Sequence, residues 1–192
     1  MAADNTKNKI VSVATKLFGR YGFHKTSMDE IAKIARKAKG SLYYHFADKE
    51  NLFTEVVAVE FENLKAQLSV VVKHDLPATE KFKMYLIKRM EILHSAVNYH
   101  ETLKADFFEH FDFIDNIRHE LDEWEKSKMR QILQEGIDSG EFIEMDNTDV
   151  ILDVFIMVLK GLDVPLFIQD KYHDLRPYLD GMLDILIRGI SK

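Results

Sequence analysis

The spacing of apolar residues predicts helices along nearly the whole chain. Apolar side chains return every three or four positions, which is the period of an amphipathic helix. The chain has only three Pro and eight Gly residues, and Gly22, Pro77 and Gly140 lie at the limits of these periodic segments. The pattern therefore predicts an all-α fold with about nine helices.

The first three predicted helices are short. The first covers about residues 5–21 and ends at Gly22, a residue type typical of a helix C-cap. The second starts at a capping box in which the Ser27 hydroxyl accepts from the Glu30 amide, and it ends near residue 35. A third helix of under two turns follows. This arrangement predicts a helix-turn-helix. The side chains expected to face inward are Ile10, Ala14, Leu17, Phe18, Tyr21, Met28, Ile31, Ala32, Ala35, Leu42 and Phe46.

Six longer helices are expected after this unit. They are predicted over about residues 49–73, from Pro77, over 101–111, over 114–139, from a cap at 146–148, and over 176–190. The last two are apolar on more than one face, which is typical of helices that are buried or lie in an interface. We expect the chain to form a homodimer through them.

Charge divides the chain unevenly. Residues 1–49 hold ten Lys and Arg against four Asp and Glu, so they carry +6. Because the whole chain carries −6, the remainder carries −12. A basic end on an acidic body predicts that one end contacts nucleic acid and the other contacts something else.

The segment K-G-S-L-Y-Y-H-F, residues 39–46, carries the clearest chemistry. Lys39 is long enough to reach guanine acceptors in the major groove or a phosphate, and Gly40 lets the backbone approach closely. The Tyr43 ring suits a thymine methyl group, whereas the Tyr44 hydroxyl suits a phosphate; either ring is otherwise a packing residue.

Three further polar residues flank these groups. Ser41 and His45 are candidate donors to the DNA backbone, although His45 equally suits a capping or packing role. Lys49 lies at the start of a helix, the unfavourable end for a cation, and a nearby phosphate would explain its position.

The chain resembles TetR-type bacterial transcriptional regulators. The resemblance covers residues 10–53, through A-T-K-L-F-G-R-Y-G-F, T-S-M-D-E-I-A, K-G-S-L-Y-Y-H-F and D-K-E-N-L-F. Residues 54–192 match only in helix count and length. The resemblance implies a DNA-binding domain over 1–48 and an effector-binding and dimerisation domain over 49–192. It assigns base contacts to Lys39, Gly40 and Tyr43, backbone contacts to Ser41, Tyr44, His45 and Lys49, and flanking phosphate contacts to Ser27 and Lys37.

The implied function is a homodimeric repressor that binds a pseudo-palindromic operator in double-stranded DNA and is released by a small-molecule effector. The chain departs from the family at Arg36-Lys37-Ala38, where Gly and a small apolar residue are usual. Without that Gly, the turn must take another conformation or hold a residue at positive φ.

The second domain is expected to hold the effector cavity. Its candidate lining residues, which are otherwise ordinary core residues, are Phe107, Phe108, Phe111, Trp124, Met129, Phe155 and Leu159. A protein of the same fold that acts through a protein partner, without a ligand pocket, is one alternative. A helical metal-binding enzyme is another, because Glu91 and His94 form one E-x-x-H.

Other classes find little support. The chain has no Cys, which excludes disulfides and thiolate metal sites. A nucleophile elbow, a P-loop and a dinucleotide fingerprint are absent, so we expect neither an enzyme nor a cofactor or metal. The start lacks an apolar signal core and the longest apolar run is too short for a bilayer, which predicts a cytoplasmic protein without a membrane span.

Overall fold

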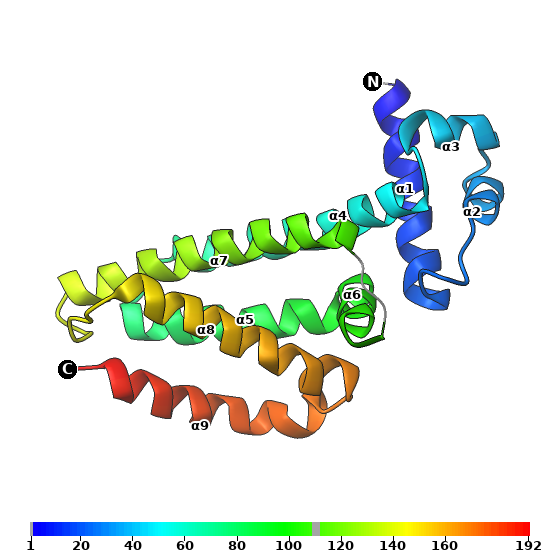
Figure 1. Ribbon diagram of the computed structural model, residues 1–192. Helices are drawn as coiled ribbons and strands as arrows, with labels where there is room; N and C mark the ends of the chain where they lie inside the picture. Colours follow the sequence, from blue (N-terminus) through cyan, green and yellow to red (C-terminus); the bar gives the residue numbers. More distant parts are fainter. Residues whose placement is uncertain (1, 109–111) are drawn as a thin grey trace. The chain divides into compact units, whose positions relative to one another are not determined.

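The computed structural model describes residues 2–108 and 112–192, with side chains over 5–104 and 112–192. Within these ranges, the chain forms nine α-helices and a π-helical segment, and its extended residues pair only at the isolated bridge Phe142–Ser191 (Figure 1). The all-α prediction is confirmed. The elements are α1 (Ala2–Tyr21), α2 (Met28–Ala35), α3 (Lys39–His45), α4 (Lys49–Val72), α5 (Ala78–Ser95), α6 (Val97–Phe108), α7 (Asp112–Asp138), α8 (Thr148–Asp163), η1 (Val164–Ile168) and α9 (Tyr172–Ile190).

The chain divides into two compact units. The first unit consists of Met1–Glu62 and Ala96–Ile117, and the second of Asn63–Ser95 and Arg118–Lys192. The long helices α4 and α7 contribute residues to both. A domain boundary between residues 48 and 49 stays a prediction.

In the first unit, α1, α2 and α3 pack around an aromatic core. The Phe18 and Phe53 rings meet edge to face at 5.1 Å between centroids, and the Phe23 ring lies 5.0 Å from that of Phe53. The predicted inward residues of these helices are buried, apart from Tyr21. Tyr21 is exposed because it is the last residue of α1, and the Arg20 guanidinium lies 5.2 Å from the centre of its ring.

A half-buried carboxylate caps the start of α6. Glu60 accepts hydrogen bonds from the backbone N–H of Asn98 at 3.2 Å, from that of Tyr99 at 2.8 Å, and from Asn98 Nδ2 at 2.7 Å. Burial raises the pKa of Glu60, and these hydrogen bonds oppose the rise. Because the cap comes from α4, the helix begins at Val97, earlier than the predicted residue 101.

The interior of the second unit contains a salt-bridge network. Arg89 on α5 donates from Nε to both oxygens of Glu125 on α7, at 2.9 and 3.1 Å. Its Nη1 and Nη2 donate to Asp163 at the end of α8, at 3.0 and 3.3 Å. All three residues are buried. Burial raises the pKa of Glu125, and Arg89 opposes that rise. The network therefore joins α5, α7 and α8 through the single side chain of Arg89.

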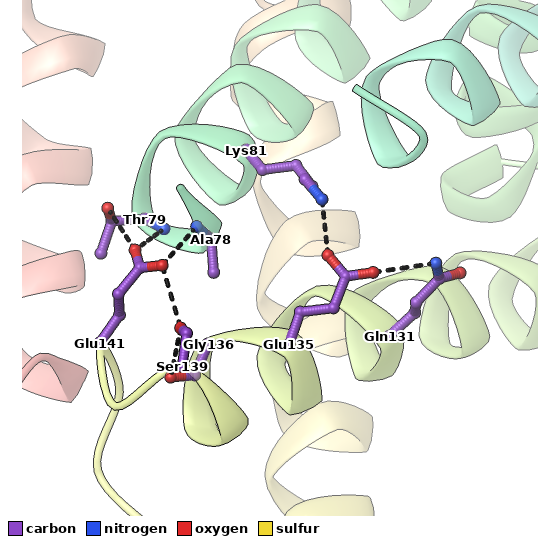
Figure 2. Close-up of polar contacts among 8 residues, drawn as sticks. All are labelled: Ala78, Thr79, Lys81, Gln131, Glu135, Gly136, Ser139 and Glu141. Carbon is purple, nitrogen blue, oxygen red and sulfur yellow. Dashed lines mark hydrogen bonds and ion pairs between the residues drawn. The ribbon is translucent and has the colours of Figure 1, made fainter. Parts of the chain in front are cut away.

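The loop after α7 caps the start of α5. Figure 2 shows the Glu141 carboxylate accepting from the backbone N–H groups of Ala78 and Thr79, each at 3.0 Å. The hydroxyls of Thr79 and Ser139 donate to the same carboxylate, also at 3.0 Å. One helical turn away, Lys81 Nζ lies 2.5 Å from Glu135. The start of α5 and the end of α7 are therefore joined by charge-assisted hydrogen bonds.

Neutralising Glu141 is expected to destabilise the protein in a pH-dependent way. Burial alone would raise the pKa of Glu141, but the hydrogen bonds from residues 78, 79 and 139 outweigh it and hold the pKa below 4.5. A lowered pKa gives stability that is present above about pH 4.5 and is lost as pH falls through the folded value.

We expect Glu141→Gln to lower the free energy of unfolding by about 1 kcal/mol at pH 7, the usual effect of losing a helix cap. The difference from wild type should shrink below about pH 4.5. Urea titrations at several pH values measure this difference in the free energy of unfolding. The control is Glu144→Gln, because Glu144 is an exposed acid in the same loop. A deficit that stays constant down to pH 3 would contradict this account.

Candidate nucleic-acid interface

The exposed face of α3 presents the predicted DNA-contacting residues. Leu42 is fully buried and Phe46 is nearly so, and these two side chains anchor the helix to the first unit. Lys39, Gly40, Tyr43 and Tyr44 are exposed, and Tyr44 is 81% exposed. The helix thus keeps one side in the core and offers a cation, a glycine and two phenols to solvent.

The turn between α2 and α3 holds a non-glycine residue at positive φ, which is one of the two alternatives that its missing Gly left open. Arg36 has φ 54° and ψ 48°, which is the left-handed region. Its N–H reaches the carbonyl of Lys33 at 3.2 Å, and the N–H of Lys37 reaches that of Ala32 at 3.0 Å. These bonds close the end of α2 and compensate for a conformation that L-residues disfavour.

Four of the predicted residues line one surface depression of about 400 Å³. Its lining includes three lysines and one acid, Asp29. Lys39 Nζ lies 2.7 Å from Asp29 Oδ1 and 5.9 Å from the centre of the Tyr43 ring. The hydrogen bond from Lys39 to Asp29 raises the pKa of the lysine, so Lys39 remains a cation. The lining residues are His24, Lys25, Thr26, Ser27, Met28, Asp29, Lys39, Tyr43 and Lys49.

Lys49 has a structural partner in the free protein. Its Nζ donates to the carbonyl of Phe23 at 3.0 Å and lies 4.3 Å from the centre of that ring. Burial lowers the pKa of Lys49, and the nearby Glu50 opposes that shift. A carbonyl and an aromatic face therefore explain a cation at this helix start, and a phosphate contact from Lys49 stays a prediction.

Ser27, which lines the depression, and three predicted residues outside its lining have contacts within the protein. Ser27 accepts from the Glu30 amide at 3.2 Å, as the capping box predicted. Lys37 donates to Thr6 Oγ1 at 3.0 Å, which joins the turn to α1. Ser41 and His45 are half-buried, and the His45 ring packs against that of Tyr44 at 5.1 Å. The DNA-contact role of each stays a prediction.

The predicted effector-lining residues do not gather at one described cavity. Met129 and Leu159 are buried in the second unit, and Trp124 is half-buried with Lys128 Nζ 5.7 Å from its ring centre. Phe155 lines an apolar pocket of about 130 Å³. The other residues of that pocket are Phe82, Leu133, Met145, Ile151, Leu152, Leu186 and Ile190. The side chains of Phe107 and Phe108, and all of Phe111, lie outside the described part of the chain.

The E-x-x-H residues serve as packing and ion-pair partners. Glu91 lies 3.4 Å from Arg176, and the His94 ring stacks on Tyr172 at 4.1 Å. Among the described residues, no group of three or more His, Asp or Glu is placed to hold a metal ion. Each helix in this same part of the chain is too short or too polar to span a bilayer.

The Asp29–Lys39 contact and the buried Arg89 network were not predicted, because no local pattern in the sequence indicates either of them. Asp29 lies in the first turn of α2, and its contact with Lys39 depends on the turn between the helices. Arg89, Glu125 and Asp163 lie far apart in the chain; the available hint was an arginine beside the apolar face of α5.

Comparisons with known proteins agree with this geometry. The family model "Bacterial regulatory proteins, tetR family" matches residues 10–56, and the model "QacR-like protein, C-terminal region" matches residues 72–192. The HTH-type transcriptional regulator QacR of Staphylococcus aureus is 25% identical, over 98% of this chain and 100% of its own.

Solved structures agree as well. A transcriptional regulator from Cytophaga hutchinsonii superposes with a TM-score of 0.80 at 25% identity, over 95% of this chain and 97% of that one. The transcriptional regulator FadR from Bacillus subtilis, solved in complex with stearoyl-CoA, gives 0.76 at 21% identity, over 95% and 98%.

Proposed function

Because this chain belongs to the TetR family of bacterial transcriptional regulators, we propose that it represses transcription as a homodimer on a pseudo-palindromic operator and that a small-molecule effector releases it. The supporting observation is the exposed row of Lys39, Gly40, Tyr43 and Tyr44 on a helix anchored by buried Leu42. Lysine reads guanine edges, and an aromatic face suits a thymine methyl. The phosphates recognised alongside them carry no sequence information.

Binding to operator DNA is expected to be sequence-specific and strongly dependent on salt. If about four residues per subunit contact phosphates, a dimer neutralises roughly eight, and log K falls with log salt at a slope near −7. Fluorescence anisotropy with the protein's own upstream DNA and a scrambled duplex measures both quantities. We expect a preference for the upstream DNA of about a thousand-fold.

Two variants in the same assay separate base reading from backbone contact. Tyr43→Ala should cost about 1–3 kcal/mol mainly on the operator, because it removes a base contact. Tyr44→Phe should weaken both duplexes equally, because it removes only a hydroxyl suited to a phosphate. Equal losses from Tyr43→Ala on both duplexes would refute base reading by that residue.

Helices α8 and α9 carry apolar side chains that face solvent in the single chain. Met157 on α8 is 70% exposed, and Tyr178 and Ile185 on α9 are 73% and 72% exposed. Val150 and Val154 extend the same exposed set. Large exposed apolar surface marks an interaction site. A second copy of the chain suits it, because two recognition helices held at a fixed distance read the two half-sites of a pseudo-palindrome.

A charge in this surface is expected to break the dimer. We expect wild type to sediment at twice the chain mass of 22.4 kDa, and Ile185→Glu to self-associate about 100-fold more weakly, because it buries an unpaired carboxylate. Analytical ultracentrifugation measures the mass, and circular dichroism checks the helical content. Val70→Glu, at an apolar residue on α4 that is 65% exposed, is the matched control. A dimeric Ile185→Glu protein would remove α9 from the interface.

The apolar pocket that includes Phe155 supports an effector with an apolar group. Its volume of about 130 Å³ is close to the roughly 150 Å³ of an apolar cavity that binds benzene. Drug-sized ligands usually need about 300–1,000 Å³. The pocket would therefore hold the apolar end of a larger molecule, and a fatty acyl thioester, the ligand class of the FadR structure, has such an end.

Acyl-CoA thioesters are the first effectors to test. We expect micromolar palmitoyl-CoA to weaken operator binding at least about ten-fold, and free CoA to leave it unchanged, because the effector must prefer the released state. Anisotropy measures release, and the melting temperature reports binding independently. If a wider panel of apolar compounds changed neither quantity, a regulator that acts through a protein partner would become the better account.

A further inference from the structure

The Asp29–Lys39 ion pair lies within the surface proposed to contact DNA. Asp29 belongs to the first turn of α2, and Lys39 is the first residue of α3. Their charged atoms are 2.7 Å apart although both side chains are more than half exposed. Asp29 is thus a negative charge among three lysines in the depression that Ser27 and Tyr43 also line.

This pair contributes little to fold stability. Exposed ion pairs usually contribute about 0.2–1 kcal/mol, because solvent screens the charges and both side chains lose freedom. A carboxylate on a DNA-contacting surface also repels phosphates, so it weakens binding to every sequence. An acid in the first turn of a helix is also favourable for the helix dipole, but Glu30 occupies the same turn. The contact with Lys39 is what distinguishes Asp29.

We propose that Asp29 is a specificity-determining positioning residue, which holds Lys39 toward base edges and away from phosphates. This inference rests on the proposed function. A free lysine at the edge of a groove binds any phosphate within reach, and each such contact adds affinity without sequence information. Asp29 competes with phosphate for the Lys39 ammonium. A guanine offers that ammonium two acceptors in the major groove. On the correct sequence, this contact therefore compensates Lys39 for leaving the Asp29 carboxylate or sharing it.

The Tyr43 ring strengthens the geometric part of this argument. Lys39 Nζ lies 5.9 Å from its centre and 2.7 Å from the Asp29 carboxylate, so the ammonium contacts both groups. The acid that contacts Lys39 therefore keeps it beside the second side chain proposed to read bases. Removal of that acid should loosen the lysine and let it find phosphates.

Asp29→Asn tests the inference against a matched control. Glu30→Gln removes the same charge from the adjacent exposed residue of α2 and leaves the Lys39 partner in place. An operator is first selected from random duplexes with the full-length wild-type protein. Affinities for that operator and for a scrambled duplex are then measured at several salt concentrations.

We expect Asp29→Asn to bind the scrambled duplex more tightly and to lower the operator preference about ten-fold, a change similar to one mismatched base pair. The salt slope on the scrambled duplex should steepen by about two per dimer, because each freed lysine gains one phosphate. Glu30→Gln should leave the preference within about two-fold of wild type. Asp29→Glu should restore most of it, because the carboxylate is kept.

A double variant decides whether Asp29 acts through Lys39. In a Lys39→Ala background, Asp29→Asn should no longer change the operator preference. Equal effects of Asp29→Asn and Glu30→Gln, or an undiminished effect without Lys39, would overturn the inference and leave the proposed function intact. A wild-type protein that selects no sequence would overturn the proposed function and this inference together.

Discussion

The surface proposed to contact DNA depends on α3, a helix of only seven residues, which is too short to be stable alone in water. Isolated helices shorter than about 12–15 residues are marginal, so α3 exists because its apolar side is buried. Leu42 is fully buried and Phe46 is 4% exposed, and the left-handed Arg36 closes the turn that brings them there. The same contacts that form the helix therefore set the direction of Lys39 and Tyr43.

Polar groups between the helices help to decide how the helices of each unit meet. In the first unit, Glu60 caps α6 from α4, and Asn98 Nδ2 also lies 3.4 Å from the carbonyl of Thr15 on α1. In the second unit, Arg89 joins α5, α7 and α8. Removing one member of a buried ion pair typically costs about 3–5 kcal/mol, because the remaining charge is left without a partner. Such networks favour one arrangement of helices over small shifts, and a ligand that moves these helices must overcome them.

The inner faces of α8 and α9 pack in the core of the second unit, whereas their outer faces are exposed in the single chain. Leu152, Ile156, Leu179 and Leu183 are buried within the second unit and hold the two helices to the rest of it. Apolar residues also occupy the opposite faces, and in the single chain these remain in contact with solvent. Apolar residues on both sides of these helices are therefore consistent with the unit's own core on one side and, on the other, the proposed contact with a second copy of the chain.

Local signals in the sequence were enough for the helical class, most helix limits, the capping box at Ser27 and the expectation of an unusual turn between α2 and α3. Each depends on neighbouring residues, so periodicity and turn chemistry reveal it. The start of α6, the partner of Lys49 and the Arg89 network needed the tertiary structure. Their hydrogen bonds join residues up to 74 positions apart, and no local pattern encodes such a distance. The Asp29–Lys39 pair combines a local and a tertiary cause. The two residues are only ten positions apart in the sequence, but the conformation of Arg36 in the turn between them brings the charges into contact.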